Sequence, residues 1–216
     1  FKNDVTLNTS ATINSSSTFL VASAGTPAAI TVAGSVLGAS DGVGTVQITN
    51  TGGTTFSGTV GNTDNTLALI NIDQDTTFSG SIETTDINNA ASTTATFSDN
   101  VTATITNSGT LLFNATDAKS VTGTIAEATG GDTTEVQVIN SANSEAPSVV
   151  TFTAAVAADT LTIGTTTYGG AALFEEAVTT PTISIVGGDH ADEDSTVTFN
   201  KAVTSSSGIT LNDQTG

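Results

Sequence analysis

The residues best suited to chemistry in this chain form a short acidic segment near its C-terminal end. Two glycines at 187–188 precede four acids within six residues, namely Asp189, Asp192, Glu193 and Asp194. Carboxylate oxygens are the hard ligands that calcium prefers, so these four residues form a candidate calcium site. A solvated acidic loop between two strands explains the same residues slightly better. Calcium is the one cofactor that the sequence suggests.

Other catalytic chemistry finds little support. The single histidine, His190, lies in the same acidic segment and has no serine or cysteine partner motif. No nucleophile elbow, phosphate-binding loop or zinc-ligand spacing is present. Sugar-cleaving sites draw on cations and on Trp or Tyr, yet the chain has three lysines, no arginine, no tryptophan and one tyrosine. We therefore expect no enzyme. A secreted carbohydrate-binding or carbohydrate-cleaving β-helix, using carboxylate pairs as acid and base, is the alternative.

The net charge of the chain limits the classes of molecule that it can bind. Its 216 residues carry 21 acids and a formal net charge of −18. Nucleic-acid binding requires clustered Lys and Arg, so this charge excludes it. The same negative charge disfavours binding to anionic membrane surfaces. No apolar run is long enough for membrane insertion. Cysteine is absent, so the sequence holds no disulfide. Methionine is absent too, including at position 1, and we expect a processed chain or a piece of a longer one.

A short motif repeats along the chain. Thr-Phe-Ser-Gly followed two residues later by Val or Ile stands at 55–60 and 77–82, and a weaker copy stands at 96–101. Nine phenylalanines continue the pattern at spacings from 16 to 39 residues, and the two longest spacings count as double turns. The resulting unit of about 20 residues is typical of a solenoid. We predict a single domain over 1–216 with turns starting near residues 1, 19, 37, 56, 78, 97, 113, 134, 152, 174 and 199.

The pattern within each unit predicts strands. Threonine stands just before most phenylalanines and Val or Ile stands four residues after seven of them, so Phe and Val point inward while Thr points outward. No segment has a sustained helical period. We predict an all-β fold, a right-handed parallel β-helix (β-solenoid) of about ten to eleven turns and about 50 Å in length. A β-sandwich of many short strands is the alternative.

The two ends of the chain suggest assembly. The last unit, 199–216, is 18 residues long, and Phe199 with Val203 would be followed in phase by Phe1 with Val5 of another copy. Solenoid ends without caps leave backbone donors and acceptors unpaired, which favours end-to-end pairing. We expect either a piece of a longer array or a subunit that binds copies of itself head to tail. Caps formed by irregular terminal segments are the alternative.

Repeated Thr-x-Thr pairs suggest ice binding as a third candidate function. Thr-x-Thr occurs at several places, including Thr94/Thr96, Thr160/Thr162 and Thr196/Thr198. A flat file of such pairs is what an ice-binding solenoid would need. Measured from the nearest phenylalanine, however, the pairs stand at differing offsets, so an ice-binding protein is the least favoured function.

The motifs at 55–60 and 77–82, together with Phe199-Asn200-Lys201-Ala202-Val203-Thr204, resemble those of bacterial β-strand-repeat surface proteins. This group includes large adhesins, autotransporter-like passengers and surface-layer or filament-forming proteins. The resemblance implies an extracellular, cell-surface protein with a structural role, in a filament, sheath, stalk or surface layer, or a role in adhesion. Copies of itself are the expected partners, with cell-surface glycans as further candidates.

Overall fold

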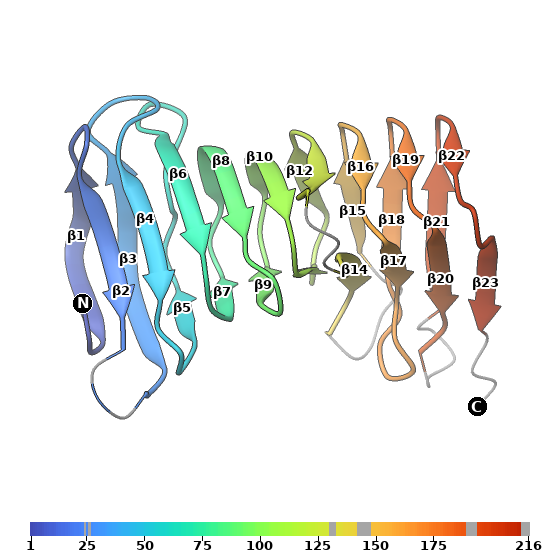
Figure 1. Cartoon of the computed structure of the whole chain (residues 1–216), viewed down its shortest axis with the longest axis horizontal. Helices are drawn as coiled ribbons and strands as arrows, with labels where there is room; N and C mark the ends of the chain where they lie inside the picture. Colours follow the sequence, from blue (N-terminus) through green and yellow to red (C-terminus); the bar gives the residue numbers. More distant parts are fainter. Residues whose placement is uncertain (24, 26, 130–132, 142–147, 189–193, 213–216) are drawn as a thin grey trace.

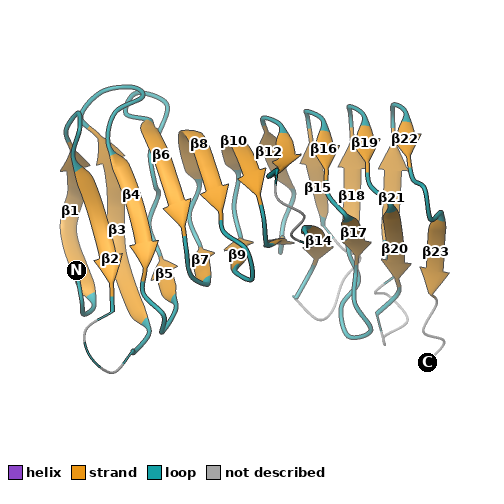
Figure 2. Cartoon of the chain, in the orientation of Figure 1, coloured by secondary structure: helices purple, strands orange, loops and turns teal. Residues whose placement is uncertain are grey.

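The chain is an all-β rod (Figure 1). The computed structural model describes residues 1–23, 25, 27–129, 133–141, 148–188 and 194–212. These residues form 23 strands, and Figure 2 shows strands and loops with no helix among them. It follows that the described ranges hold no helix long and apolar enough to cross a membrane. The N- and C-terminal ends lie at opposite ends of the rod.

The strands form two sheets. The first sheet has ten strands in the order β1 (Val5–Ile13), β3 (Ile30–Gly38), β5 (Thr54–Phe56), β7 (Thr76–Phe78), β9 (Thr94–Phe97), β11 (Thr110–Asn114), β14 (Glu135–Ile139), β17 (Thr160–Ile163), β20 (Thr182–Val186) and β23 (Ile209–Asn212). The main path of the second sheet is β2 (Thr18–Ala22), β4 (Thr45–Thr49), β6 (Leu67–Ile72), β8 (Ile82–Asn89), β10 (Val101–Asn107), β12 (Lys119–Thr122), β15 (Val149–Phe152), β18 (Ala171–Phe174) and β21 (Thr196–Phe199). Beside it run four short strands, β13 (Ile125–Glu127), β16 (Val156–Ala157), β19 (Val178–Thr179) and β22 (Val203–Thr204). Every pairing among the described strands is parallel, as a solenoid requires and a β-sandwich does not allow.

Three columns of interior residues, each joined from turn to turn by strand register, describe how the coil is packed. Column I follows the first sheet: Val5, Val32, Phe56, Phe78, Phe97, Phe113, Val138, Ile163, Ile185 and Leu211. Column II starts in β1 and β3 and continues along the second sheet: Ala11, Val36, Val60, Ile82, Val101, Val121, Phe152, Phe174 and Phe199. Column III lies on the second sheet: Phe19, Val46, Ile70, Ile87, Ile105, Ile125, Val156, Val178 and Val203. Away from the two ends of the rod these residues are buried, and each contributes about 1.5 to 3 kcal/mol of burial free energy.

The phenylalanines occupy different columns. Four stack in column I, from Phe56 to Phe113, with ring centroids 5.2 to 5.6 Å apart. Three others, from Phe152 to Phe199, stack in column II at 4.7 and 5.2 Å. Between the two groups Phe113 meets Phe152 edge to face at 5.2 Å. The spacing of phenylalanines therefore does not measure the length of a turn.

The number of turns is lower than predicted. Nine steps along column I, from residue 5 to residue 211, average about 23 residues and range from 16 to 27. The nine strands on the main path of the second sheet enclose about eight complete turns, so the predicted ten to eleven is an overcount. The overcount comes from the two long phenylalanine spacings. Each of them joins phenylalanines of different columns and therefore covers less than the two whole turns that the spacing suggests.

The expected phase match between the chain ends is also wrong. Phe199 belongs to column II, where it pairs with Phe174. Phe1 instead lies along the outer edge of β2, where its amino group donates to the Leu20 carbonyl oxygen and its own carbonyl oxygen accepts from the Ala22 N–H at 2.8 Å. The Phe1 ring rests on the Phe19 ring. Phe1 and Phe199 thus mark different points of the coil.

The glycine of the repeated motif has a packing cause. Gly80 stands directly over Gly58 of the preceding turn, and a Cβ built on Gly80 would lie 2.7 Å from the Gly58 carbonyl group. Gly58 stands in the same way over Gly34, at 2.4 Å. A side chain at either corner would push successive turns apart, because backbone atoms cannot yield as a flexible side chain can.

Candidate functional site

The acidic segment falls largely outside the described residues. Asp189, Asp192 and Glu193 lie there, so their calcium binding stays a prediction. Asp194 is described and borders a hollow at the C-terminal end of the rod together with Ser195, Leu211 and Asn212. Within the described ranges no three His, Asp or Glu residues are grouped closely enough to hold a metal ion.

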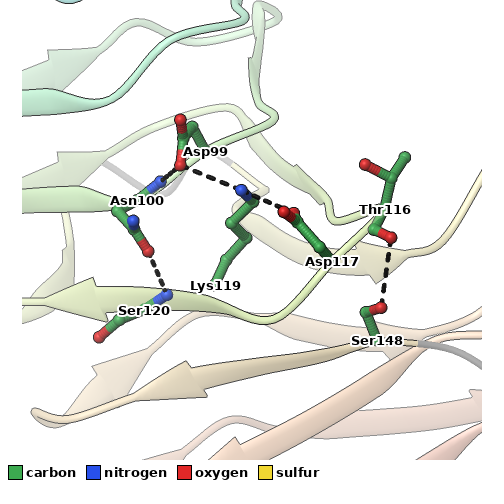
Figure 3. Close-up of polar contacts among 7 residues, drawn as sticks. All are labelled: Asp99, Asn100, Thr116, Asp117, Lys119, Ser120 and Ser148. Atoms are coloured by element: carbon green, nitrogen blue, oxygen red, sulfur yellow. Dashed lines mark hydrogen bonds and ion pairs between the residues drawn. The ribbon is translucent and has the colours of Figure 1, made fainter.

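One charged cluster is well defined (Figure 3). Lys119, at the start of β12, pairs with the Asp117 carboxylate at 2.6 Å and with the Asp99 carboxylate at 3.1 Å. Asp99 belongs to the corner of the preceding turn, where it also accepts from the Asn100 N–H at 2.7 Å. Asn100 in turn accepts from the Ser120 N–H at 2.8 Å. The cluster therefore ties two successive turns together at the place where the phenylalanines pass from column I to column II.

The environment of Lys119 supports a structural role for it. The hydrogen bond that Lys119 donates to Asp117 raises the pKa of the Lys119 ammonium. The hydrogen bond to Asp99 and its negative charge raise this pKa further, and partial burial lowers it. The side chain is only 15% exposed, and a raised pKa keeps it protonated rather than available as a base. The Lys119 ammonium neutralises the carboxylates of Asp99 and Asp117, and these ion pairs link two successive turns.

We expect Lys119→Met to lower the free energy of unfolding by about 1 kcal/mol at neutral pH, because Asp99 and Asp117 are partly solvated. A lysine whose folded pKa is raised stabilises the fold fully below its unfolded pKa of about 10.4. That stabilisation is lost as pH rises through the folded value. Urea titrations of both proteins at neutral pH and at alkaline pH check this. A gap between them that persisted at the most alkaline pH would show that packing, not charge, is at stake.

Buried amides form a second polar feature. The side chain of Asn107 accepts from Asn89 Nδ2 at 2.9 Å and from the Gly109 N–H at 3.1 Å, and it donates to the carbonyl oxygens of Gly109 and Glu135. Thr93 donates to Asn89 Oδ1 at 2.8 Å. These residues stand at the corner where the chain leaves the second sheet for the first. They satisfy buried backbone groups that no strand partner can reach.

Among the described residues, one buried hydroxyl has no hydrogen-bond partner. Thr54 and Thr76 occupy equivalent inward positions in β5 and β7, and both are buried. Thr76 Oγ1 donates to the Gln74 carbonyl oxygen at 2.8 Å. Thr54 Oγ1 makes no hydrogen bond with any described residue. An unpaired buried hydroxyl costs about 1 to 3 kcal/mol.

Thr54→Val should therefore raise the free energy of unfolding by about 1 kcal/mol, since valine keeps the shape and removes the unpaired oxygen. Thr76→Val is the matched control in the next turn. It loses a hydrogen bond and should leave stability unchanged or lower it by up to about 1 kcal/mol. Chemical denaturation of the two variants decides the matter. Equal effects at both positions would mean that Thr54 does have a partner.

The outer face of the first sheet carries a file of hydroxyls. Residues just before column I are aligned from turn to turn as Thr31, Thr55, Thr77, Thr96, Leu112, Gln137, Thr162, Ser184 and Thr210. The sequence predicts the outward threonines that precede phenylalanine, such as Thr55, Thr77 and Thr96, but not the full length of the file, because offsets measured from phenylalanine shift where the phenylalanines change column. Leu112 and Gln137 interrupt the file. A groove of about 320 Å³ runs beside its first half, bordered by Asp75, Thr77 and Thr96.

The two ends of the rod expose the apolar interior. Large exposed apolar side chains at the ends are Phe1 (54%) in the first turn and Ile209 (52%) and Leu211 (73%) in the last strand. Leu20 (44%) is also exposed, but it lies on the outer face of β2 next to Gln47. A hollow of about 430 Å³ opens at the N-terminal end, bordered by the Phe1 and Phe19 rings. The edge strands β1 and β23 each have a paired neighbour on one side only among the described strands. The sequence pattern alone does not identify which side chains are exposed at these ends.

Comparison with known proteins adds no relative. No protein family model matches the chain, and neither the curated proteins nor the solved structures contain a significant match to it.

Proposed function

We propose that this chain is a structural protein of the cell surface that associates with copies of itself through the ends of its solenoid. The assembly would be a filament, sheath, stalk or surface layer. The observation that carries the proposal is the exposure of apolar residues and unpaired strand edges at both ends of the rod. An exposed sheet edge is a template for pairing with another strand. The ladders inside the rod already display the pairing that a second copy would continue.

Several properties of the sequence support an extracellular setting. The motifs resemble those of bacterial β-strand-repeat surface proteins, and the chain is free of cysteine. Its net charge of −18 favours solubility of a long β surface.

We expect the coil to be right-handed, because connections between parallel strands of one sheet are almost always right-handed.

Negative-stain electron microscopy of the purified chain tests the proposal. One rod spans nine spacings of the first sheet, or about 43 Å at about 4.8 Å per strand. We expect unbranched particles several times longer than this, growing with protein concentration. Single rods at every concentration would overturn self-association. Release of reducing sugars from a polysaccharide panel would favour the carbohydrate-active alternative.

A second candidate function is adhesion to neutral glycans through the groove on the first sheet. The groove is lined mainly by threonines of three successive turns and holds one acid, Asp75. Hydroxyl groups both donate and accept hydrogen bonds, as sugar recognition requires. Binding of the chain to immobilised neutral polysaccharides, lost in Thr55→Val/Thr77→Val and retained in Thr106→Val on the other sheet, would support this function. Equal binding by both variants would contradict it.

A further inference from the structure

Column I ends in an incompletely buried apolar residue at each end of the rod. Column I runs from Val5 to Leu211, and both of these residues are incompletely buried. If a second copy continued the first sheet, Leu211 would meet Val5 directly and column I would continue. Column II runs from Ala11 to Phe199 and has nine members against ten in column I, so Phe199 would lie two layers below Ala11 of the next copy. Direct contact between the two copies is therefore made along column I.

The strand edges have the same orientation. β1 and β23 are the first and last strands of the first sheet, and all ladders between them are parallel. The free edge of β23 in one copy therefore runs in the same direction as the free edge of β1 in the next copy, without any rotation of the coil. Contact between two C-terminal ends would instead reverse one copy and pair the strands antiparallel.

Charge separates the ends from the body. All 21 acids fall at residue 4, between residues 41 and 194, or at residue 213. The segments 5–40 and 195–212, which form the first and last turns, contain no acid. Asp4 accepts from the Thr31 N–H at 2.8 Å, so its carboxylate is engaged within its own chain. Two copies brought side by side repel through their anionic bodies, whereas two copies brought end to end join acid-free segments in which Lys201 is the one charged side chain.

Phe1 covers part of the strand edge at the N-terminal end of the rod, so that part is not open to backbone pairing with another copy. Because Phe1 lies along β2, a joining copy meets the Phe1 ring on the column III side rather than an open strand edge. The Phe1 ring is half exposed and apolar, so it offers Val203 of the joining copy a packing surface. Backbone pairing is then confined to β23 and β1.

We propose that copies of this chain associate head to tail in one register, with β23 of one copy added in parallel to β1 of the next. Leu211 stands opposite Val5 of the next copy, Thr210 opposite Asp4 and Asn212 opposite Thr6. This register continues column I without a break. The inference rests on the proposed function and specifies the partner surfaces that carry it.

Engineered cysteines test the register, because the natural chain has none. Asn212 and Thr6 are exposed, and in-register neighbours on paired strands lie within the roughly 4.4 to 6.8 Å Cα separation that a disulfide bridges. The variant Thr6→Cys/Asn212→Cys should form a ladder of disulfide-linked oligomers on a non-reducing gel after mild oxidation. An intramolecular link is impossible, since the two positions lie at opposite ends of the rod.

Three controls fix the interpretation. Each single-cysteine variant should stay largely uncrosslinked, and abundant dimers of Asn212→Cys alone would show a head-to-head joint and overturn the proposal. Thr6→Cys/Thr210→Cys is out of register by two residues and should crosslink at least fivefold less. Equal crosslinking of the two pairs would contradict the stated register. Long particles without any crosslink would overturn the register but leave self-association intact, whereas single rods in every variant would overturn both.

Discussion

Replacing Phe78 by alanine is expected to lower the free energy of unfolding by about 3 to 5 kcal/mol. Phe78 is 1% exposed and lies between the rings of Phe56 and Phe97, with centroid distances of 5.2 and 5.6 Å. Its removal opens a cavity between two turns that cannot close, because the register of both ladders holds the turns in place. A loss of this size is a large part of the stability of a typical domain, about 5 to 15 kcal/mol.

Thr77→Ala is the matched control for Phe78→Ala. Thr77 is the preceding residue on the same strand, and its side chain points outward between two inward residues. We expect it to change stability by less than about 0.5 kcal/mol. Denaturant titration followed by circular dichroism measures both variants. A loss below about 1 kcal/mol in Phe78→Ala would contradict the stacked interior.

Replacing Asn107 by alanine is the second large effect, with an expected loss of about 3 to 5 kcal/mol. The side chain of Asn107 is fully buried and takes part in four hydrogen bonds. Its loss leaves the Gly109 N–H, the Asn89 amide and two carbonyl oxygens without this partner, and each unsatisfied group costs about 1 to 3 kcal/mol. Partial rearrangement of the corner keeps the total below the full sum.

Asn88→Ala provides the comparison for Asn107→Ala. Asn88 pairs with Thr106 in the same ladder, but its side chain points outward and donates to Asn71 Oδ1 at 3.0 Å in an exposed position. We expect a loss of at most about 1 kcal/mol there. Thermal unfolding of both variants gives the ranking. Similar melting temperatures for the two would show that the buried amides do not hold the corner.

The fold class followed from the sequence because one physical requirement repeats. Each short strand needs an apolar residue inward and a small polar residue outward, and each turn must stack on the one before. The strands at 45–49 and 135–139, which lack phenylalanine, were predictable for the same reason and carry Val46 and Val138 inward.

The change of column was hidden from sequence reasoning. In the first half of the rod Phe56 and Val60 join columns I and II across one corner. In the second half Phe152 and Val156 join columns II and III across the next corner. Both corners are crossed in four residues, so the same motif fits either. Nothing local in the sequence distinguishes the two corners. For this reason the predicted turn count is too high, and the continuation of the threonine file beyond the phenylalanines is not predicted.

The polar features were harder to foresee. Asn89 and Asn107 end strands in a chain rich in asparagine, so composition gives no sign that their side chains turn inward. Lys119 pairs with the nearby Asp117 and also with Asp99, which lies 20 residues earlier on the preceding turn, so the cluster depends on the length of that particular turn. The candidate calcium site at 189–194 is suggested by its density of acids alone, and charge density does not determine how the carboxylates are arranged in space.

Sedimentation velocity of the chain and of Leu211→Asp over a wide range of concentration tests self-association through the ends most directly. The wild-type sedimentation coefficient should rise with concentration. Leu211→Asp should sediment as a single rod throughout, because a carboxylate desolvated at the joint costs several kcal/mol. Thr106→Asp adds the same charge on the outer face of β10, where the side chain is exposed, and should associate like the wild type. Concentration-independent single rods for the wild-type chain, or undiminished association of Leu211→Asp, would contradict the account.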